Sequence, residues 1–221
     1  MSRHMAWLAG RGVSMSCGLD WNVPPALEAA FRDRTLSRLQ LKARICDELS
    51  RAQDDPSIDC RPLDALLDRA RASSRWRHAL VTTNWDELLD RTAARYGFEP
   101  PLHLNGSVGG RNILLEDDDD RAREAVPQAR EGLRRLLEAD VVVAAGLSLA
   151  SRLDKALLSR LAGKRGGRWL VVNHDAQQVR RACEELRRRL PGCSVHAAEL
   201  PFDEWVRAGF PGLNIAGERA A

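Results

Sequence analysis

The feature that most constrains this chain is a short apolar run that ends in closely spaced glycines. Residues 5–9 are apolar and long enough to form a buried strand. Gly10 and Gly12 follow directly, and a third glycine stands at Gly18. Glycine has no Cβ, so the backbone at Gly10 and Gly12 can turn tightly and come close to a ligand. The pattern predicts the strand–turn–helix unit that opens many α/β nucleotide-binding domains.

The serines after these glycines add a possible anion site. We expect Ser14 or Ser16 to cap the next helix, whose free N–H groups would face an anion such as a phosphate. The glycine spacing is G-x-G-x-x-x-x-x-G and differs from the G-x-G-x-x-G dinucleotide fingerprint, so it does not indicate an ordinary dehydrogenase. By itself the motif is equally typical of a structural turn.

Size and charge exclude several classes of protein. The chain has 221 residues, with 34 Lys and Arg against 31 Asp and Glu, a formal net charge of +3. This balance disfavours nucleic-acid binding. No apolar run approaches membrane-spanning length, and residues 1–4 are too short for a signal peptide, so we expect no membrane partner. We expect a cytoplasmic protein with one domain over residues 1–221.

Neither the cysteines nor the acidic run predicts a metal site. The five cysteines are odd in number and contain no C-x-x-C pair, which argues against a zinc ribbon and a disulfide framework. Residues 117–120 are four consecutive aspartates, which we expect to form the solvated first turn of a helix. Four adjacent carboxylates cannot all face one ion, so a metal there is disfavoured.

Apolar runs and helical periodicities alternate along most of the chain. The continuous apolar run at 140–146 is typical of a central parallel strand that is covered on both faces. The alternation predicts an α/β fold with a Rossmann-like, doubly wound, mostly parallel sheet. Residues 112–115 are a candidate extra strand. The main strands are expected at 5–9, 78–83, 102–104, 140–146, 169–173 and 194–198.

A helical insertion at about 24–74 interrupts this alternation. Its leucines recur at helical spacing, Thr35 and Ser37 mark a break between two helices, and Pro62 opens another helix. Two interpretations stay open. The insertion either packs on the sheet as a structural element or covers a ligand cleft.

Polar residues follow the predicted strands where each one ends. Because the carboxyl ends of parallel strands line the ligand crevice, these residues are expected to converge there. Amides and hydroxyls suit a ribose, and backbone N–H groups suit phosphates. Asn84 is also a candidate N-cap for the helix that follows it. The strand-end groups are Gly10, Gly12 and Ser14, then Asn84 and Asp86, then Asn105 and Ser107, then Gly146 and Ser148, and finally Asn173.

The same residues resemble the sirtuin family in order and spacing, over about residues 6 to 175. The resemblance is closest to the bacterial sirtuin-like branch that lacks the zinc module. The glycine turn resembles the family's G-A-G-x-S signature, and Thr82-Thr83-Asn84-x-Asp86 resembles its T-Q-N-x-D. The motifs that carry the resemblance are Gly10-x-Gly12-Val13-Ser14-x-x-x-Gly18-Leu19, Thr82-Thr83-Asn84-Trp85-Asp86, Leu104-Asn105-Gly106-Ser107, Gly146-Leu147-Ser148 and Val172-Asn173.

The resemblance implies a Rossmann-like sheet that binds NAD and cleaves its nicotinamide–ribose bond. By similarity, Asn84 would orient a water beside the nicotinamide ribose, and Asp86 would support that loop. The glycine turn would hold the pyrophosphate, and the residues after the later strands would face the adenosine. The implied NAD-binding set is Gly10, Arg11, Gly12, Val13, Ser14, Gly18, Thr83, Gly146, Leu147, Ser148 and Asn173.

The chain departs from the family at the general base. The family places a histidine where this chain has Asn105, and an amide cannot accept a proton near neutral pH. His103 lies two residues earlier on the same side of a strand, and it either replaces the base or is structural. Arg11 stands where the family has alanine, so it either contacts phosphate or blocks the turn. The family's Pro-Asp-Phe-Arg stretch is not recognisable at 20–22.

Two hypotheses follow. The first is NAD glycohydrolase-type cleavage, which is favoured over lysine deacylation because the base is missing. The second is a catalytically inactive sensor for NAD, ADP-ribose or a related nucleotide that signals to a protein partner or within a homo-oligomer. Asn84 and Asp86 favour the first, and Asn105 favours the second. A nucleotide-processing enzyme of another α/β family is a third, weaker hypothesis.

Overall fold

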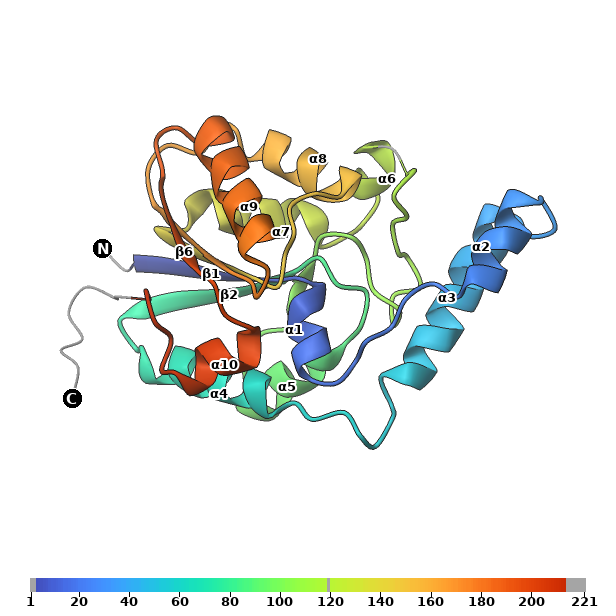
Figure 1. Ribbon diagram of the computed structural model, residues 1–221, viewed down its shortest axis with the longest axis horizontal. Coiled ribbons are helices and arrows are strands. Elements are labelled where there is room, and N and C mark those ends of the chain that lie inside the picture. Colours follow the sequence, from blue (N-terminus) through green and yellow to red (C-terminus); the bar gives the residue numbers. More distant parts are fainter. Residues whose placement is uncertain (1–2, 119, 214–221) are drawn as a thin grey trace.

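A parallel β-sheet lies between two layers of helices in the computed structural model, which describes residues 3–118 and 120–213 (Figure 1). The sheet has six strands in the order β3-β2-β1-β4-β5-β6, and every neighbouring pair is parallel. The predicted α/β Rossmann-like fold is confirmed. The strands are β1 (Arg3–Ala9), β2 (Trp76–Thr82), β3 (Leu102–His103), β4 (Val141–Ala145), β5 (Arg168–Val172) and β6 (Ser194–Ala198).

Most of the helices cover the two faces of the sheet. The helices are α1 (Arg11–Ser16), α2 (Pro25–Arg32), α3 (Arg38–Ala52), α4 (Arg61–Ala72), α5 (Leu88–Tyr96), α6 (Asp120–Glu124), α7 (Ala129–Glu138), α8 (Arg152–Arg160), α9 (Ala176–Arg189) and α10 (Phe202–Arg207).

The strand order reverses direction at β1. The chain runs from β1 outward to β2 and β3 on one side, and then returns to place β4, β5 and β6 on the other side. Ala9 of β1 pairs in register with both Thr82 of β2 and Ala145 of β4, so these strands end level with one another. In an open α/β sheet, the carboxyl ends on either side of such a reversal border the ligand crevice.

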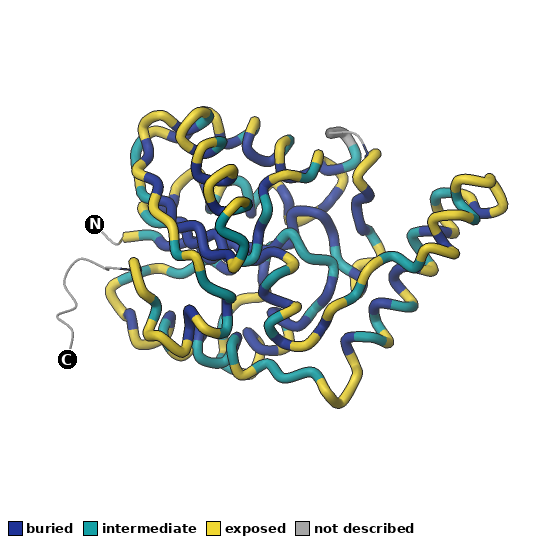
Figure 2. Tube along the Cα trace, viewed as in Figure 1, coloured by how far each residue is buried: buried dark blue, intermediate teal, exposed yellow. Residues whose placement is uncertain are grey.

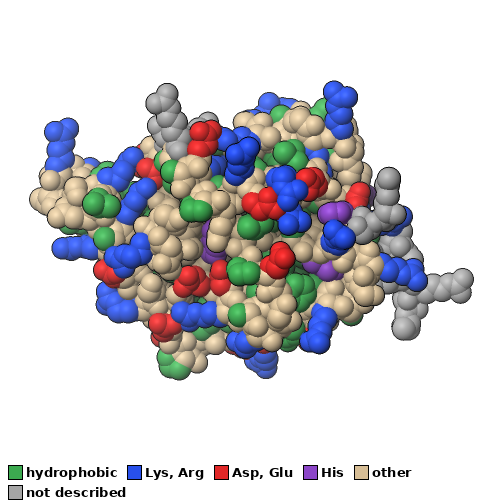
Figure 3. Space-filling view, turned by 180° about the vertical axis from the view of Figure 1, so that it is seen from behind, with side chains coloured by type: hydrophobic (Ala, Val, Ile, Leu, Met, Phe, Trp, Pro, Cys, Tyr) green, Lys and Arg blue, Asp and Glu red, His purple; other side chains and the backbone are tan. Residues whose placement is uncertain are grey.

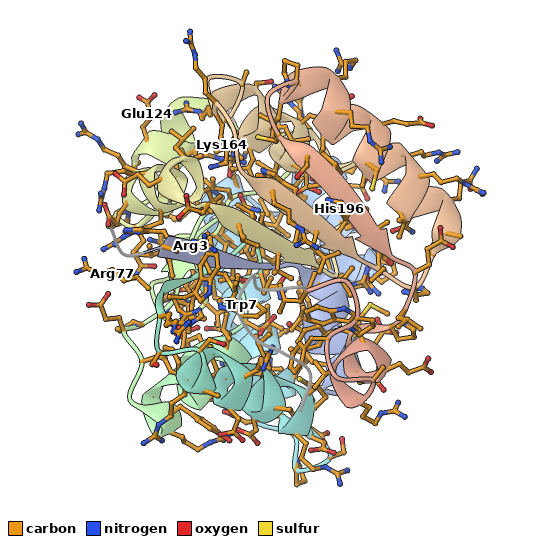
Figure 4. All side chains as sticks on the ribbon, turned by 90° about the vertical axis from the view of Figure 1, so that its left-hand side faces the viewer. Arg3, Trp7, Arg77, Glu124, Lys164 and His196 are labelled. Atoms are coloured by element: carbon orange, nitrogen blue, oxygen red, sulfur yellow. The ribbon has the colours of Figure 1, made fainter. Side chains whose placement is uncertain are left out.

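Alternate side chains of each strand enter two separate cores. Trp7 packs on the face that α4, α5 and α10 cover, and its indole N–H donates to His78 Nδ1 at 3.0 Å. Leu8 points to the opposite face, which α7, α8 and α9 cover. Figure 2 shows the resulting band of buried residues through the centre of the molecule, and Figure 4 shows Trp7 inside it. Coverage of both faces explains why the strands are continuously apolar.

Helices α2 and α3 extend away from the sheet beyond the carboxyl end of β1 (Figure 1). Ser37 caps α3 by accepting from Gln40 N–H, while Gln40 Oε1 accepts from Ser37 N–H. This capping box marks the predicted break between the two helices. The far end of α3 is fixed to the body, because Glu87 N–H donates to Gln53 Oε1 at 2.8 Å. Helix α4 instead buries its leucines beside α5 and α10.

Two local predictions between β3 and α6 are wrong. Residues 112–115 form no strand, although Ile113 and Leu114 are buried, because the loop folds back onto the body and Leu114 N–H donates to Asn105 O. Asp118 is buried and not solvated, because it accepts from Lys42 Nζ at 2.6 Å. Asp119 lies outside the described residues.

The surface carries charges of both signs. On the face seen in Figure 3, Lys and Arg side chains are interspersed with Asp and Glu. Within residues 3–118 and 120–213, no helix is long and apolar enough to cross a membrane. In the same residues, no cluster of three or more His, Cys, Asp or Glu side chains has a geometry that could hold a metal ion.

Candidate functional site

An open pocket with a volume of about 700 Å³ lies at the carboxyl ends of the strands, where the sheet order reverses. Three residues of the predicted site, Val13, Gly18 and His103, are outside its lining. The predicted residues that line it are Gly10, Arg11, Gly12, Ser14, Thr83, Asn84, Asp86, Asn105, Gly146, Leu147, Ser148 and Asn173.

Glycines allow the end of β1 and the end of β4 to pack backbone against backbone. A Cβ on Gly12 would lie 2.7 Å from Gly146 Cα, and a Cβ on Gly10 would lie 2.5 Å from Leu147 Cγ. Gly146 has a φ of +67°, in the left-handed region, and its Cβ would lie 2.5 Å from Val13 N. The glycine pattern is therefore needed first for close packing at the base of the pocket.

The turn at Gly10 differs from the predicted capped turn. Gly10 is the N-cap of α1, and no side chain caps this helix, so the prediction that Ser14 or Ser16 caps it is wrong. Gly12 N–H donates to Gly146 O at 3.0 Å, and Val13 N–H donates to Gly10 O at 2.9 Å. These two amides are used inside the protein, so they are not free to bind an anion in this conformation.

Ser14 instead connects two residues of the β2–α5 loop. Its hydroxyl donates to Asp86 Oδ2 at 2.7 Å and accepts from Asn84 Nδ2 at 2.8 Å. The second Nδ2 hydrogen of Asn84 goes to Gly10 O at 3.0 Å. Both amide hydrogens are thus used, while Asn84 Oδ1 accepts no hydrogen bond from the described residues. The network holds Asn84 in place and leaves its oxygen for a ligand.

Asp86 is the buried end of this network. Burial raises the pKa of its carboxyl, and the hydrogen bonds from Ser14 and from Leu88 N–H oppose that rise. The N-cap of α5 is Glu87, so the prediction that Asn84 caps this helix is wrong. Asn84 is used in other contacts instead. Its Nδ2 donates to Ser14 of α1, and its own N–H donates to Thr82 Oγ1.

His103 lies behind the pocket wall. It is 2% exposed, and its Nε2 lies 2.9 Å from Asp90 Oδ2 on α5. Its Nδ1 lies 3.0 Å from Asn84 O, so it supports the loop from behind. Burial disfavours the charged imidazole, but the hydrogen bond and charge of Asp90 outweigh burial and raise the pKa of His103. This environment is that of a structural ion pair.

Asn105 lies in the pocket wall and is held at both ends. Its Nδ2 donates to Thr83 O at 3.1 Å, and its Oδ1 accepts from Arg123 Nη2 at 3.2 Å. Arg123 is 2% exposed and also donates to Leu153 O at 2.8 Å. The Asn105 side chain therefore connects the end of β2 to α6. It carries no group that accepts a proton near neutral pH.

The opposite wall follows β4 and β5. Asn173 Nδ2 donates to Leu147 O at 3.1 Å and contacts Gln178 Oε1 at 3.3 Å. Ser148 Oγ accepts only a 3.3 Å hydrogen bond from Ala150 N–H among the described residues. Gln178 Nε2 donates to Asp175 Oδ2 at 3.2 Å, so both ends of the Gln178 amide are engaged, and the Ser148 hydroxyl is the polar group that offers a hydrogen to a ligand on this side.

Two further residues of the predicted NAD-binding set, Arg11 and Gly18, differ in their relation to the pocket. Arg11 lines the pocket, and its exposed guanidinium pairs with Asp20 at 2.7 Å. Gly18 has a φ of +94° and packs beside Ser57 and Ile58, so its role is in the backbone turn after α1.

Several pocket residues were missed by the sequence reasoning. Asp154, at the start of α8, is buried, and burial raises the pKa of its carboxyl. Its N–H donates to Ser151 Oγ, and the Ser-x-x-Asp spacing of a helix start was the signal that could have located it. The other lining residues that were missed come from loops and helix faces: Met15, Leu19, Trp21, Asn22, Val23, Leu49, Trp85, Glu116, Ser151, Leu153, His174 and Gln178.

Solved structures that are similar to this chain include sirtuins. A mutant Sir2 with a p53 peptide and NAD matches with a TM-score of 0.55 and 16% identity, over 94% of this chain and 92% of that chain. Another Sir2 mutant, with a deacetylated p53 peptide and 3′-O-acetyl-ADP-ribose, has a TM-score of 0.54 and 17% identity, over 93% and 92% of the two chains. The chain has a sirtuin-like fold.

The similarity lies in the fold and is weak in sequence. A structure that concerns sirtuin substrate affinity matches over 95% of this chain and 94% of that chain, with a TM-score of 0.50 and 16% identity. No family model matches the sequence, and the search of curated proteins found no match.

Proposed function

We propose that this sirtuin-like chain binds NAD, or another nucleotide that contains ADP-ribose, in the pocket at the β1–β4 reversal. We propose further that it hydrolyses NAD between nicotinamide and ribose. Support for binding comes from the pocket volume of about 700 Å³, within the ~300–1,000 Å³ of small-molecule sites, and from the polar strand ends around it. The sirtuin structures with NAD and an ADP-ribose product have the same architecture.

The observation that carries the hydrolase proposal is the state of Asn84. Ser14 and Gly10 fix its amide group, and its Oδ1 has no partner among the described residues. In the proposed reaction the nicotinamide–ribose bond breaks, nicotinamide leaves with the bonding electrons, and water adds to the ribose carbon and loses one proton to solvent. Asn84 Oδ1 would accept a hydrogen from that water and hold it in position, while Ser14 and Asp86 keep the amide still.

Lysine deacylation is not part of the proposal. Asn105 cannot take a proton from a ribose hydroxyl near neutral pH, and both ends of its amide are already engaged, with Thr83 and Arg123. We do not assign the base role to His103, because it lies outside the pocket lining and is paired with Asp90. Simple hydrolysis needs only a positioned water and a leaving nicotinamide, so it makes less demand on a base.

A second candidate function is a sensor that binds the nucleotide without turnover. The observation that favours it is again Asn105, whose oxygen faces a buried guanidinium where catalysis would need a base. In this case the same pocket holds NAD or ADP-ribose, and the signal passes to a protein partner or a second copy of the chain.

Release of nicotinamide at high protein concentration, followed by chromatography, separates the two functions. We expect the wild-type protein to release nicotinamide and Asn84→Ala to release it at least about tenfold more slowly. Calorimetry should show that Asn84→Ala still binds NAD. Glu138→Gln, on the outer face of α7, is the control that should match wild type. Binding without release would leave only the sensor, and absence of both binding and release would overturn the proposal.

A further inference from the structure

Two cysteines far apart in the sequence meet behind the loop that lines the pocket. Cys17 ends α1 and is 1% exposed, whereas Cys60 precedes α4 and is half-buried. Asp59 N–H donates to Cys17 O at 2.8 Å, so Cys60 directly follows the residue that is hydrogen-bonded to Cys17, and Cys60 packs against the core cluster that contains Cys17. Gly18 packs against Ser57 O, so the two segments run side by side over several residues.

The surroundings give the two sulfurs different properties. The neighbouring Cys17 thiol is the largest influence on Cys60 and, aided by the Thr92 hydroxyl and the charge of Arg95, lowers the pKa of its thiol to about 7 against the opposing effect of burial. The same contact and burial raise the pKa of Cys17. An accessible thiolate beside a protonated thiol is the arrangement of a peroxide-sensitive cysteine and its resolving partner.

The remaining cysteines lack this arrangement. Cys46, Cys183 and Cys193 are buried, and burial raises the pKa of each of their thiols. Cys193 Sγ donates to Gly166 O, and Cys183 Sγ lies 4.0 Å from His196 O, so neither contacts another sulfur. Cys60 is therefore the thiol that an oxidant should reach first.

We propose that Cys60 is a site of oxidation by hydroperoxides and that Cys17 converts the oxidised form to an intramolecular disulfide. The Cys60 thiolate attacks a peroxide oxygen, the O–O bond breaks, and the sulfur becomes a sulfenic acid while the departing oxygen takes a proton as water or alcohol. The Cys17 sulfur then attacks the Cys60 sulfur. The S–S bond forms as the S–O bond breaks, and the hydroxide leaves with the Cys17 proton as water.

The bond would act on the pocket through the segment that follows α1. Leu19, Trp21 and Val23 of this segment line the pocket, and Cys17 is the residue from which it leaves the helix. A disulfide to Cys60 would fix the start of the segment to the residue before α4. The disulfide needs only the proximity of Cys17 and Cys60, whichever nucleotide the pocket binds.

Disulfide mapping of the full chain tests the proposal. The protein is treated with stoichiometric hydrogen peroxide, its free thiols are alkylated under denaturing conditions, and unreduced peptides are identified by mass spectrometry. We expect a Cys17–Cys60 linked peptide that disappears after reduction with dithiothreitol. The proposal would be overturned if Cys60 were recovered alkylated and unlinked after treatment with enough peroxide to oxidise the other cysteines.

Variants separate the two steps. In Cys17→Ala, we expect Cys60 to stop at the sulfenic acid, which dimedone traps, whereas Cys183→Ala should still form the Cys17–Cys60 bond. In Cys60→Ser, the fastest thiol reaction with a disulfide reagent should slow on the order of tenfold. If Cys17→Ala does not fold, the disulfide map of the wild-type protein and the reactivity of Cys60→Ser still test the proposal. An unchanged fast reaction in Cys60→Ser would contradict the assignment of Cys60.

Discussion

The Ser14 hydroxyl donates a 2.7 Å hydrogen bond to the buried carboxylate of Asp86, 72 residues further along the chain. The same hydroxyl accepts from Asn84 Nδ2 at 2.8 Å. One oxygen thus ties the helix after β1 to the loop after β2 and fixes the amide that we propose positions the attacking water. The orientation of Asn84 depends on Ser14 as much as on its own loop.

Replacing Ser14 should therefore destabilise the protein. In Ser14→Ala, buried Asp86 loses a donor and Asn84 loses an acceptor, and we expect the free energy of unfolding to fall by about 1–3 kcal/mol. Ser16→Ala on the same helix is the matched control, because Ser16 Oγ bonds only to Gly12 O within the helix, and we expect a change below about 0.5 kcal/mol. Urea unfolding measures both. Equal losses in the two variants would contradict the role of Ser14.

The contact between α1 and the end of β4 gives a second prediction. Gly12→Ala would place a Cβ 2.7 Å from Gly146 Cα, and backbone cannot move aside as a flexible side chain can. We expect a loss of about 2 kcal/mol or more, together with loss of nucleotide binding. Gly163→Ala is the control, because no atom lies within 4 Å of its added Cβ. A thermal unfolding temperature that falls as much in Gly163→Ala as in Gly12→Ala would refute this account.

The His103–Asp90 pair predicts a pH dependence of stability. Its neighbours raise the pKa of His103 in the folded protein above the ordinary value of 6.5, despite burial. The folded state therefore binds the proton more tightly than the unfolded state, so this stabilisation is fully present below pH 6.5 and is lost as the pH rises through the folded-state pKa.

We expect Asp90→Asn to remove this contribution. Urea unfolding of wild type and variant across pH 5.5 to 8.5 should show a stability difference that is largest at low pH and shrinks as the pH rises, about as expected for one titrating group. Cys60 titrates in the same range with the opposite sign, and the comparison between the two proteins cancels its effect. A difference that grows with pH would show that the pair does not hold a charged His103.

The sheet and its crevice could be predicted because their signals are local. Each main strand is a visible apolar run, and a parallel sheet brings the polar residues after those runs to one edge, as Asn84 and Asn173 show. The helix caps could not be predicted in the same way. Serine is a residue type that often caps helices, but the Ser14 hydroxyl donates to Asp86 instead. Only the folded structure brings Ser14 and Asp86 together.

The same limit explains the other differences. Ile113, Leu114 and Leu115 give residues 112–115 the pattern of a strand, but these three side chains are buried in a loop that folds over the body without pairing with the sheet. Arg123 was not identifiable as the partner of Asn105, since nothing in the spacing of an isolated arginine indicates that it is buried. Tertiary packing determines which polar groups pair when they are far apart in the sequence. Periodicity and motif spacing do not predict such pairs.

The two contacts of Asn105 predict that it is needed for stability more than for catalysis. Asn105→Ala leaves Thr83 O without its donor and takes away the acceptor of the 3.2 Å bond from Arg123, so we expect a loss of about 1–3 kcal/mol by urea unfolding. Asn22→Ala is the matched control. Asn22 lines the same pocket but is exposed, so its loss should stay below about 0.5 kcal/mol.

The activity of Asn105→Ala then separates a structural amide from a catalytic one. A working general base contributes about 10²–10⁴-fold to a rate. Because Asn105 carries no such base, we expect nicotinamide release per folded molecule to fall less than about tenfold, in contrast to Asn84→Ala. A loss of a hundredfold or more with NAD binding intact would mean that Asn105 acts on the reacting atoms, and the division of roles between the two asparagines would have to be reversed.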